Sequence, residues 1–259
     1  MSRLDNQVAA GDAAGGGTAG APACSARAEW IVLLVALSLP SLVTWIYFIL
    51  LSGQPAMKVA YVVAKTVQFG LPLVWVMGVC RERPRLNLKP SGGMALGIGF
   101  GLLVVAAVQV VYYGWLKSSP AFGPFAERLQ EKVTGMGALS PVRFILLGAF
   151  ISVIHSFLEE YYWRWFVYGR LRTLVPVGWA VLVSSIGFMA HHVLVVGAYV
   201  DLEHWPVIAF LSVSVAVGGA FWAWLYQRTG SLLAPWISHL LVDVALIVVG
   251  YDQLWGLGR

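Results

Sequence analysis

Charge is what this sequence has least of. Only 11% of its 259 residues are Asp, Glu, Lys or Arg, whereas hydrophobic residues make up 59%. A soluble domain usually carries about 25% charged residues. The composition therefore excludes a disordered chain, a collagen-like fibre and an ordinary water-soluble enzyme, and it indicates an integral membrane protein. The net charge of +5 is typical of the positive-inside bias of such proteins, so we expect no nucleic-acid partner.

Cysteine is also scarce, and several familiar motifs are missing. Cys24 and Cys80 cannot form a framework of several disulfides, and their spacing matches no metal site. The sequence has no Gly-rich phosphate loop, no dinucleotide fingerprint, no Gly-x-Ser-x-Gly elbow and no His-Glu-x-x-His run. It also shows no internal repeat and no second soluble domain. These absences argue against a nucleotide-binding protein or a serine hydrolase, and they leave zinc without its usual protease motif.

Long apolar runs are what the chain has in abundance. Seven of them approach or exceed the ~20 residues that cross ~30 Å of hydrocarbon. They lie at residues 30–51, 59–79, 94–116, 142–168, 176–198, 206–226 and 232–250. The predicted fold class is therefore all-α: a polytopic transmembrane helix bundle of about seven or eight spans.

The rest of the chain completes the domain organisation. Residues 1–28 are rich in Ala and Gly and predict a disordered tail with no convincing signal peptide. Residues 29–141 hold the N-terminal transmembrane helices and a surface segment, because residues 122–137 are too polar to span and have their apolar residues at helical spacing. Residues 142–250 form the remaining transmembrane region, and every chemical motif lies there.

The basic residues predict an orientation. In a seven-span arrangement, ten of the 17 Lys and Arg residues fall on the side of the N-terminus, and Arg81, Arg83, Arg85 and Lys89 crowd one short loop there. The positive-inside rule then predicts a multi-pass protein with a cytoplasmic N-terminus and its C-terminus outside.

The first polar cluster lies in the fourth span. An ionised group inside a membrane helix costs about 3 kcal/mol or more, which favours a functional interpretation. Glu160 and Arg164 are four residues apart and share a helix face, so they can pair. Glu159 points about 100° away, without that partner. His155, four residues earlier, can contact it. We expect Glu160 to be structural and Glu159 to be free to act as a base. The alternative for Glu160 and Arg164 is a plain interfacial ion pair, with the arginine reaching water.

Two further clusters supply imidazoles. His191 and His192 are adjacent in the fifth span and cannot face the same way, so one of them can be a packed structural residue. His239 and Asp243 share one face of the last span, where the aspartate can fix the tautomer of the imidazole or simply satisfy it. Together with Glu159, these clusters provide the base and the oxyanion donors of a hydrolytic site. Two histidines and one glutamate also match the ligands of a catalytic zinc.

The three clusters in order resemble a known signature. The patterns are Glu159-Glu160-x-x-x-Arg164, Phe188-x-x-x-His192 and His239-x-x-x-Asp243. They resemble the motifs of the CPBP family (CAAX-protease and bacteriocin-processing, also called Abi), whose eukaryotic members are the Rce1-type prenyl-protein endopeptidases. The resemblance covers residues 142–250. It implies an all-helical bundle of about eight spans, the eighth hidden in residues 120–140, and an intramembrane endopeptidase that cleaves a membrane-anchored or lipidated protein near its terminus.

The resemblance also implies roles for these residues. Glu159 and His192 would activate a water, while His239 and Asp243 would help form the oxyanion site. A one-residue slip of the second motif selects His191 in place of His192.

The resemblance gives Glu160 and Arg164 an architectural role and leaves the cofactor open. Members are described as metalloproteases and also as metal-independent glutamic proteases. If a divalent metal such as zinc is used, the expected ligands are Glu159, His192 and His239; otherwise no cofactor is expected.

One departure and two alternatives accompany this interpretation. Asp243 stands where eukaryotic members tend to carry Asn, which favours a prokaryotic membrane protein and weakens the inference of a prenylated substrate. Buried Glu, His and Asp residues also form relays in proton-coupled transporters, although the inverted repeats that would support a transporter are not found. A non-enzymatic immunity or sorting factor that keeps the fold is the third hypothesis.

Overall fold

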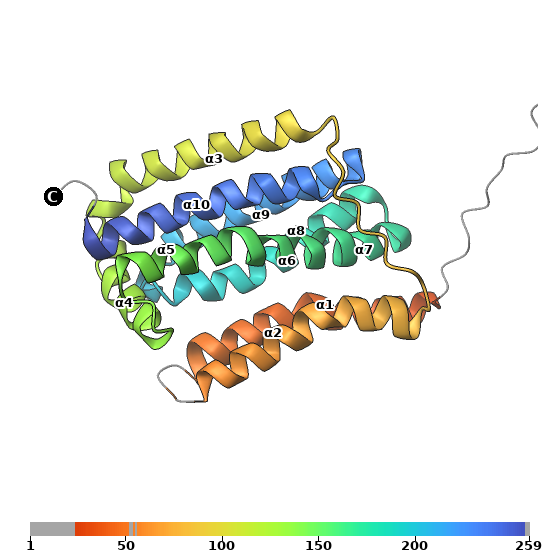
Figure 1. The fold of residues 1–259 in the computed structure, drawn as a ribbon, viewed down its shortest axis with the longest axis horizontal. Helices are drawn as coiled ribbons and strands as arrows, with labels where there is room; N and C mark the ends of the chain where they lie inside the picture. Colours follow the sequence, from red (N-terminus) through yellow and green to blue (C-terminus); the bar gives the residue numbers. More distant parts are fainter. Residues whose placement is uncertain (1–23, 52–53, 55, 257–259) are drawn as a thin grey trace, which may run out of the picture.

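The computed structural model describes residues 24–51, 54 and 56–256, which form a bundle of long helices that run roughly side by side (Figure 1). Seven helical stretches are long and apolar enough to cross a membrane: Ala26–Leu50, Val59–Val79, Met94–Ser118, Pro141–Leu174, Val177–Gly197, Leu202–Thr229 and Leu233–Trp255. Each coincides with a predicted run to within a few residues. Since the described part of the chain contains no strand, the all-α polytopic fold class is confirmed.

The helices pack in a defined order. α3 lies along α10, α8 lies along α9, and α1 packs on both α8 and α2 (Figure 1). Their bounds are α1 (Ala26–Trp45), α2 (Met57–Leu73), α3 (Met94–Gly114), α8 (Val177–Gly197), α9 (Trp205–Thr229) and α10 (Leu233–Trp255). α1 and α2 continue as π-helical turns, η1 (Ile46–Leu50) and η2 (Val74–Val79).

The structure corrects two predictions, the start of the first helix and the eighth span expected in residues 120–140. The helix begins at Ala26 and not after residue 28, because the Ser25 side chain accepts a hydrogen bond from the Ala28 amide and caps it. Residues 1–23 of the predicted tail lie outside the described residues. The surface segment forms α4 (Phe125–Gly135), whose 11 residues are too few to cross a bilayer, so residues 120–140 hold no eighth span.

The fourth span is one helical run with two π-helical interruptions. Ser140 caps its start and Pro141 occupies the first turn, where a missing amide hydrogen has no consequence. Interruptions of this kind occur often at functional sites. The segments are α5 (Pro141–Phe150), η5 (Ile151–His155), α6 (Ser156–Glu160), η6 (Tyr161–Tyr168) and α7 (Gly169–Leu174). The run ends at Leu174, six residues beyond the predicted end at residue 168.

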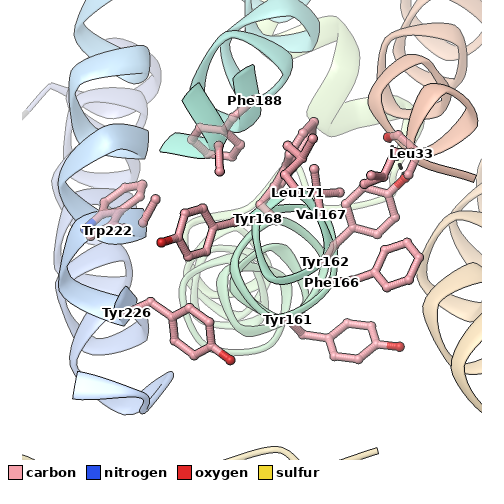
Figure 2. Packing of buried hydrophobic residues seen from close by; sticks show 14 of the residues in the cluster. Leu33, Tyr161, Tyr162, Phe166, Val167, Tyr168, Leu171, Phe188, Trp222 and Tyr226 are labelled. Atoms are coloured by element: carbon pink, nitrogen blue, oxygen red, sulfur yellow. Dashed lines mark hydrogen bonds between the residues drawn. The ribbon is translucent and has the colours of Figure 1, made fainter. Parts of the chain in front are cut away.

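The main apolar core surrounds η6. Figure 2 looks along this helix, whose aromatic side chains point outward on several sides toward the neighbouring helices. Leu33 of α1, Phe188 of α8 and Trp222 of α9 belong to the same buried cluster. The helix that carries the paired carboxylates is therefore held on several sides by large side chains.

A disulfide joins the two cysteines. Cys24 precedes α1 and Cys80 follows η2, with their Cα atoms 5.1 Å apart. No disulfide framework was expected from the sequence, and the structure has one bridge, between these two cysteines. This bridge closes a loop of 56 residues in sequence separation, which constrains the unfolded chain and contributes roughly 4 kcal/mol in the chain-entropy treatment.

Close approach of α3 to α10 generates the first prediction. A Cβ atom at Gly97 would lie 2.6 Å from the carbonyl oxygen of Ala234, whereas one at Gly99 would meet nothing within 4 Å. We expect Gly97→Ala to separate the helices and to lower the free energy of unfolding by about 1–3 kcal/mol. Gly99→Ala, the same change in the same helix, should be neutral or slightly stabilising. Thermal unfolding in detergent measures both, and equal midpoints would contradict the observed packing.

Candidate active site

Glu160 connects two helices. Its side chain is fully buried, and its Oε2 lies 3.2 Å from Nε of Arg164, one turn further along the same run. Its Oε1 lies 2.7 Å from Nδ1 of His239 on α10. The ion pair predicted from the i,i+4 spacing is present. The hydrogen bond between helices was not predicted.

Arg164 is enclosed by aromatic rings. Its side chain is 2% exposed, so the alternative of an arginine that reaches water at the interface is wrong. The guanidinium lies 4.6 Å from the ring centroid of Phe188 and 5.0 Å from that of Trp222. Gly219 leaves room for this arrangement, because a Cβ there would lie 3.2 Å from Phe188 and 3.6 Å from Nη2 of Arg164. Arg164 therefore has a structural role in the site.

Glu159 faces imidazoles. Its side chain is 5% exposed, with Oε1 3.5 Å from Nε2 of His191 and Oε2 3.6 Å from Nε2 of His239. His155, one turn earlier, also interacts with it electrostatically. Among the described residues, no Lys or Arg lies within ion-pair distance of Glu159. A buried carboxylate that contacts imidazoles and no Lys or Arg is suited to accept a proton, and such catalytic contacts often shorten only when substrate binds.

The two adjacent histidines of α8 both lie beside Glu159, but they differ in their own support. His191 is the nearer one, with its Nε2 toward the carboxylate and its ring parallel to that of Trp163. His192 Nδ1 lies 2.8 Å from the carbonyl oxygen of Phe188. Because a carbonyl only accepts, this nitrogen carries the proton and Nε2 of His192 is left as an acceptor. His191 is therefore nearer to Glu159, whereas His192 is the histidine whose tautomer is fixed.

His239 lies among three carboxylates. Its Nδ1 donates to Glu160, because a carboxylate only accepts, so Glu160 and not Asp243 orients this ring through Nδ1. Its Nε2 lies 3.7 Å from Oδ1 of Asp243 and 3.6 Å from Oε2 of Glu159. The ring also stacks on Trp222, with centroids 4.2 Å apart. The structure thus brings the residues of all three motifs to one buried point.

The donors around Glu159 fit a metal ion in composition. Glu159, His191 and His192 each offer one ligand atom, and these atoms lie within 4.8 Å of one another. One Glu and two His match a catalytic zinc, and the bond from His192 to a backbone carbonyl is the support that a zinc-bound imidazole normally has. His191 lacks such support within the described chain, since its Nδ1 is buried without a hydrogen-bond partner. The group in the structure is therefore Glu159, His191 and His192, with His191 where His239 was expected from the sequence.

Lys65 is the residue that sequence reasoning missed. It lies inside α2, where its Nζ donates to the buried Gln68 at 3.2 Å, and it interacts electrostatically with Glu159 and His155. A signal was available in the charge count. Lys65 is the one Lys, Arg, Asp or Glu in the predicted span at residues 59–79.

A cavity of about 540 Å³ lies elsewhere, where the loop that follows η2 meets η6, α7 and α9. Arginines line much of it, and Arg170 is paired there with Glu29 and Glu82. None of the carboxylates and imidazoles of the three motifs lines it. We place the candidate active site at the buried cluster of carboxylates and imidazoles, because these groups can transfer protons and the cavity contains none of them.

One comparison with known proteins bears on this site. Residues 141–245 match the family model described as type II CAAX prenyl endopeptidase Rce1-like. The matched region begins with α5, ends within α10 and contains all three motifs, so the resemblance drawn from them is confirmed there. No curated protein and no solved structure matches the chain significantly. The match supports an endopeptidase of the type II CAAX kind in an integral multi-pass membrane protein.

Proposed function

We propose that the Rce1-like region at residues 141–245 makes this chain an intramembrane endopeptidase that cleaves a membrane-anchored or lipidated protein near its terminus. One observation carries the proposal. Two neighbouring buried carboxylates have different partners in the described part of the chain: Glu160 is bound to Arg164 and His239, while the ion-pair contacts of Glu159 are to imidazoles. This difference leaves Glu159 free for proton transfer.

The proposed reaction is direct attack by water, because no Ser or Cys lies in the three motifs. Glu159 takes a proton from the water, and Nε2 of His192 accepts its second hydrogen bond. The oxygen attacks the scissile carbonyl carbon and forms a tetrahedral intermediate. Glu159 then returns the proton to the leaving amine as the carbon–nitrogen bond breaks, which balances the step.

His239 is proposed to stabilise the oxyanion. Since Nδ1 already donates to Glu160, Nε2 is a donor only when both ring nitrogens carry a proton. Glu160, Glu159 and Asp243, all within 3.7 Å of the ring nitrogens, surround that cation. A preorganised donor of this kind acts strongly where water is excluded.

A zinc ion, if bound, would be held by Glu159, His191 and His192, where it would polarise a carbonyl and lower the pKa of a bound water. Nδ1 of His191 accepts no hydrogen bond from, and donates none to, any residue that the structure describes, which favours the mechanism without metal, since zinc-bound imidazoles normally have that support.

The predicted orientation is also retained as a proposal. The loop with Arg81, Arg83 and Arg85 then faces the cytoplasm, together with the disulfide between Cys24 and Cys80. Cytoplasmic disulfides are uncommon, so this bridge would be reducible there.

The first prediction of the proposal concerns Glu159. We expect Glu159→Gln to lower the rate of cleavage by at least about a hundredfold, because the amide cannot accept a proton. The assay uses the full chain in liposomes and a peptide with a prenylated cysteine close to its free C-terminus. Glu127→Gln, the same change at an exposed position of α4, is the matched control. Cleavage at the wild-type rate by the Glu159→Gln protein would reject this assignment.

The second prediction concerns the metal. We expect a zinc chelator to leave cleavage unchanged, because the proposed base is a carboxylate and His191 lacks the support of a metal ligand. The measurement is the initial rate before and after chelation, with zinc added back to a third sample. Inhibition that zinc reverses would replace the metal-free mechanism with a zinc site at Glu159, His191 and His192.

A further inference from the structure

Lys65 is an ionisable residue in a span that is otherwise apolar. It lies within the Val59–Val79 stretch, whose mean hydropathy of 1.6 is high enough for a membrane span in spite of the lysine. Charged residues at such positions face the interior of a bundle and normally have a partner or a function. Lys65 follows the first part of this rule: its ammonium lies over the Phe69 ring, 5.4 Å from the centroid, and that ring meets His155 edge-on.

The ammonium has unused donors. It has three N–H groups, and among the described residues only the side chain of Gln68 accepts one of them. No carboxylate lies within 4.0 Å of Nζ in the part of the chain that the structure covers, and Glu159 acts on it from a longer distance. The cation thus lies near the acidic cluster without being neutralised by direct contact.

The charges of the site explain what such a cation can do. Glu159, Glu160 and Asp243 are clustered, and the one guanidinium beside them among the residues that the structure describes, that of Arg164, is bound to Glu160. A substrate cut near its C-terminus brings a fourth carboxylate, its own terminus, into this low-dielectric region. Such a group is repelled by the acidic cluster and loses its hydration, so it needs a cation to offset both costs.

We propose that Lys65 is the binding site for the C-terminal carboxylate of the substrate. This inference rests on the proposed function. Lys65 reaches the site through Phe69: the ammonium lies over this ring, and the ring meets His155, one turn before Glu159, edge-on.

The test compares two substrates that differ only at the terminus. The prenylated peptide is prepared with a free C-terminal carboxylate and with a C-terminal amide, and kcat and KM are measured for the full chain in liposomes. A charge-assisted hydrogen bond lost to the amide should lower kcat/KM by about tenfold to a hundredfold, mainly through KM. Lys65→Met should bring the ratio of the two kcat/KM values close to one, and Lys65→Arg should restore most of it.

Lys89→Met is the matched control, because Lys89 is exposed in the loop at the end of the bundle and should keep the preference for the free acid. Equal cleavage of acid and amide by the wild-type chain would overturn the inference and leave the proposed function standing. A Lys65→Met protein that keeps the full preference would overturn it too. Should this variant fail to fold, Lys65→Gln takes its place, because the amide keeps a hydrogen-bond donor beside Gln68 and removes only the charge. Cleavage of neither peptide would reject the proposed function, and the inference with it.

Discussion

The buried carboxylate of Glu160 is the interaction on which the rest of the site depends. It neutralises Arg164 within its own helical run and orients His239 on α10, so one side chain fixes both the charge balance and the position of a second helix. In a medium where an unpaired buried charge is costly, the ion pair and the bond to His239 keep this carboxylate from being an isolated charge. The aromatic rings of Phe188 and Trp222 complete it, and Glu159 is left available for chemistry.

What lies along one helix could be predicted from the sequence. The seven spans follow from hydropathy, because no soluble alternative exists for runs of that length. The pairing of Glu160 with Arg164 follows from the helical repeat, as does the shared face of His239 and Asp243. The end of the fourth span was misjudged by six residues, because Arg170 and Arg172 interrupt the apolar run although the helical run continues to Leu174.

Contacts between helices could not be predicted in this way. The bond from Glu160 to His239 depends on where α10 lies against α6, and the choice between His191 and His192 depends on how α8 is rotated. Neither appears in the spacing of residues along one helix. Lys65 was missed for a different reason, since one charge barely lowers the hydropathy of a 21-residue span.

The central claim, that adjacent carboxylates have separate roles, is tested most directly by thermal unfolding of two variants in detergent. Glu160→Gln leaves the buried Arg164 without its counter-charge and should lower the free energy of unfolding by about 3–5 kcal/mol. Glu159→Gln should leave it unchanged or raise it, because a residue kept for chemistry contributes little to stability. Equal losses for both variants, or a loss confined to Glu159→Gln, would contradict the account.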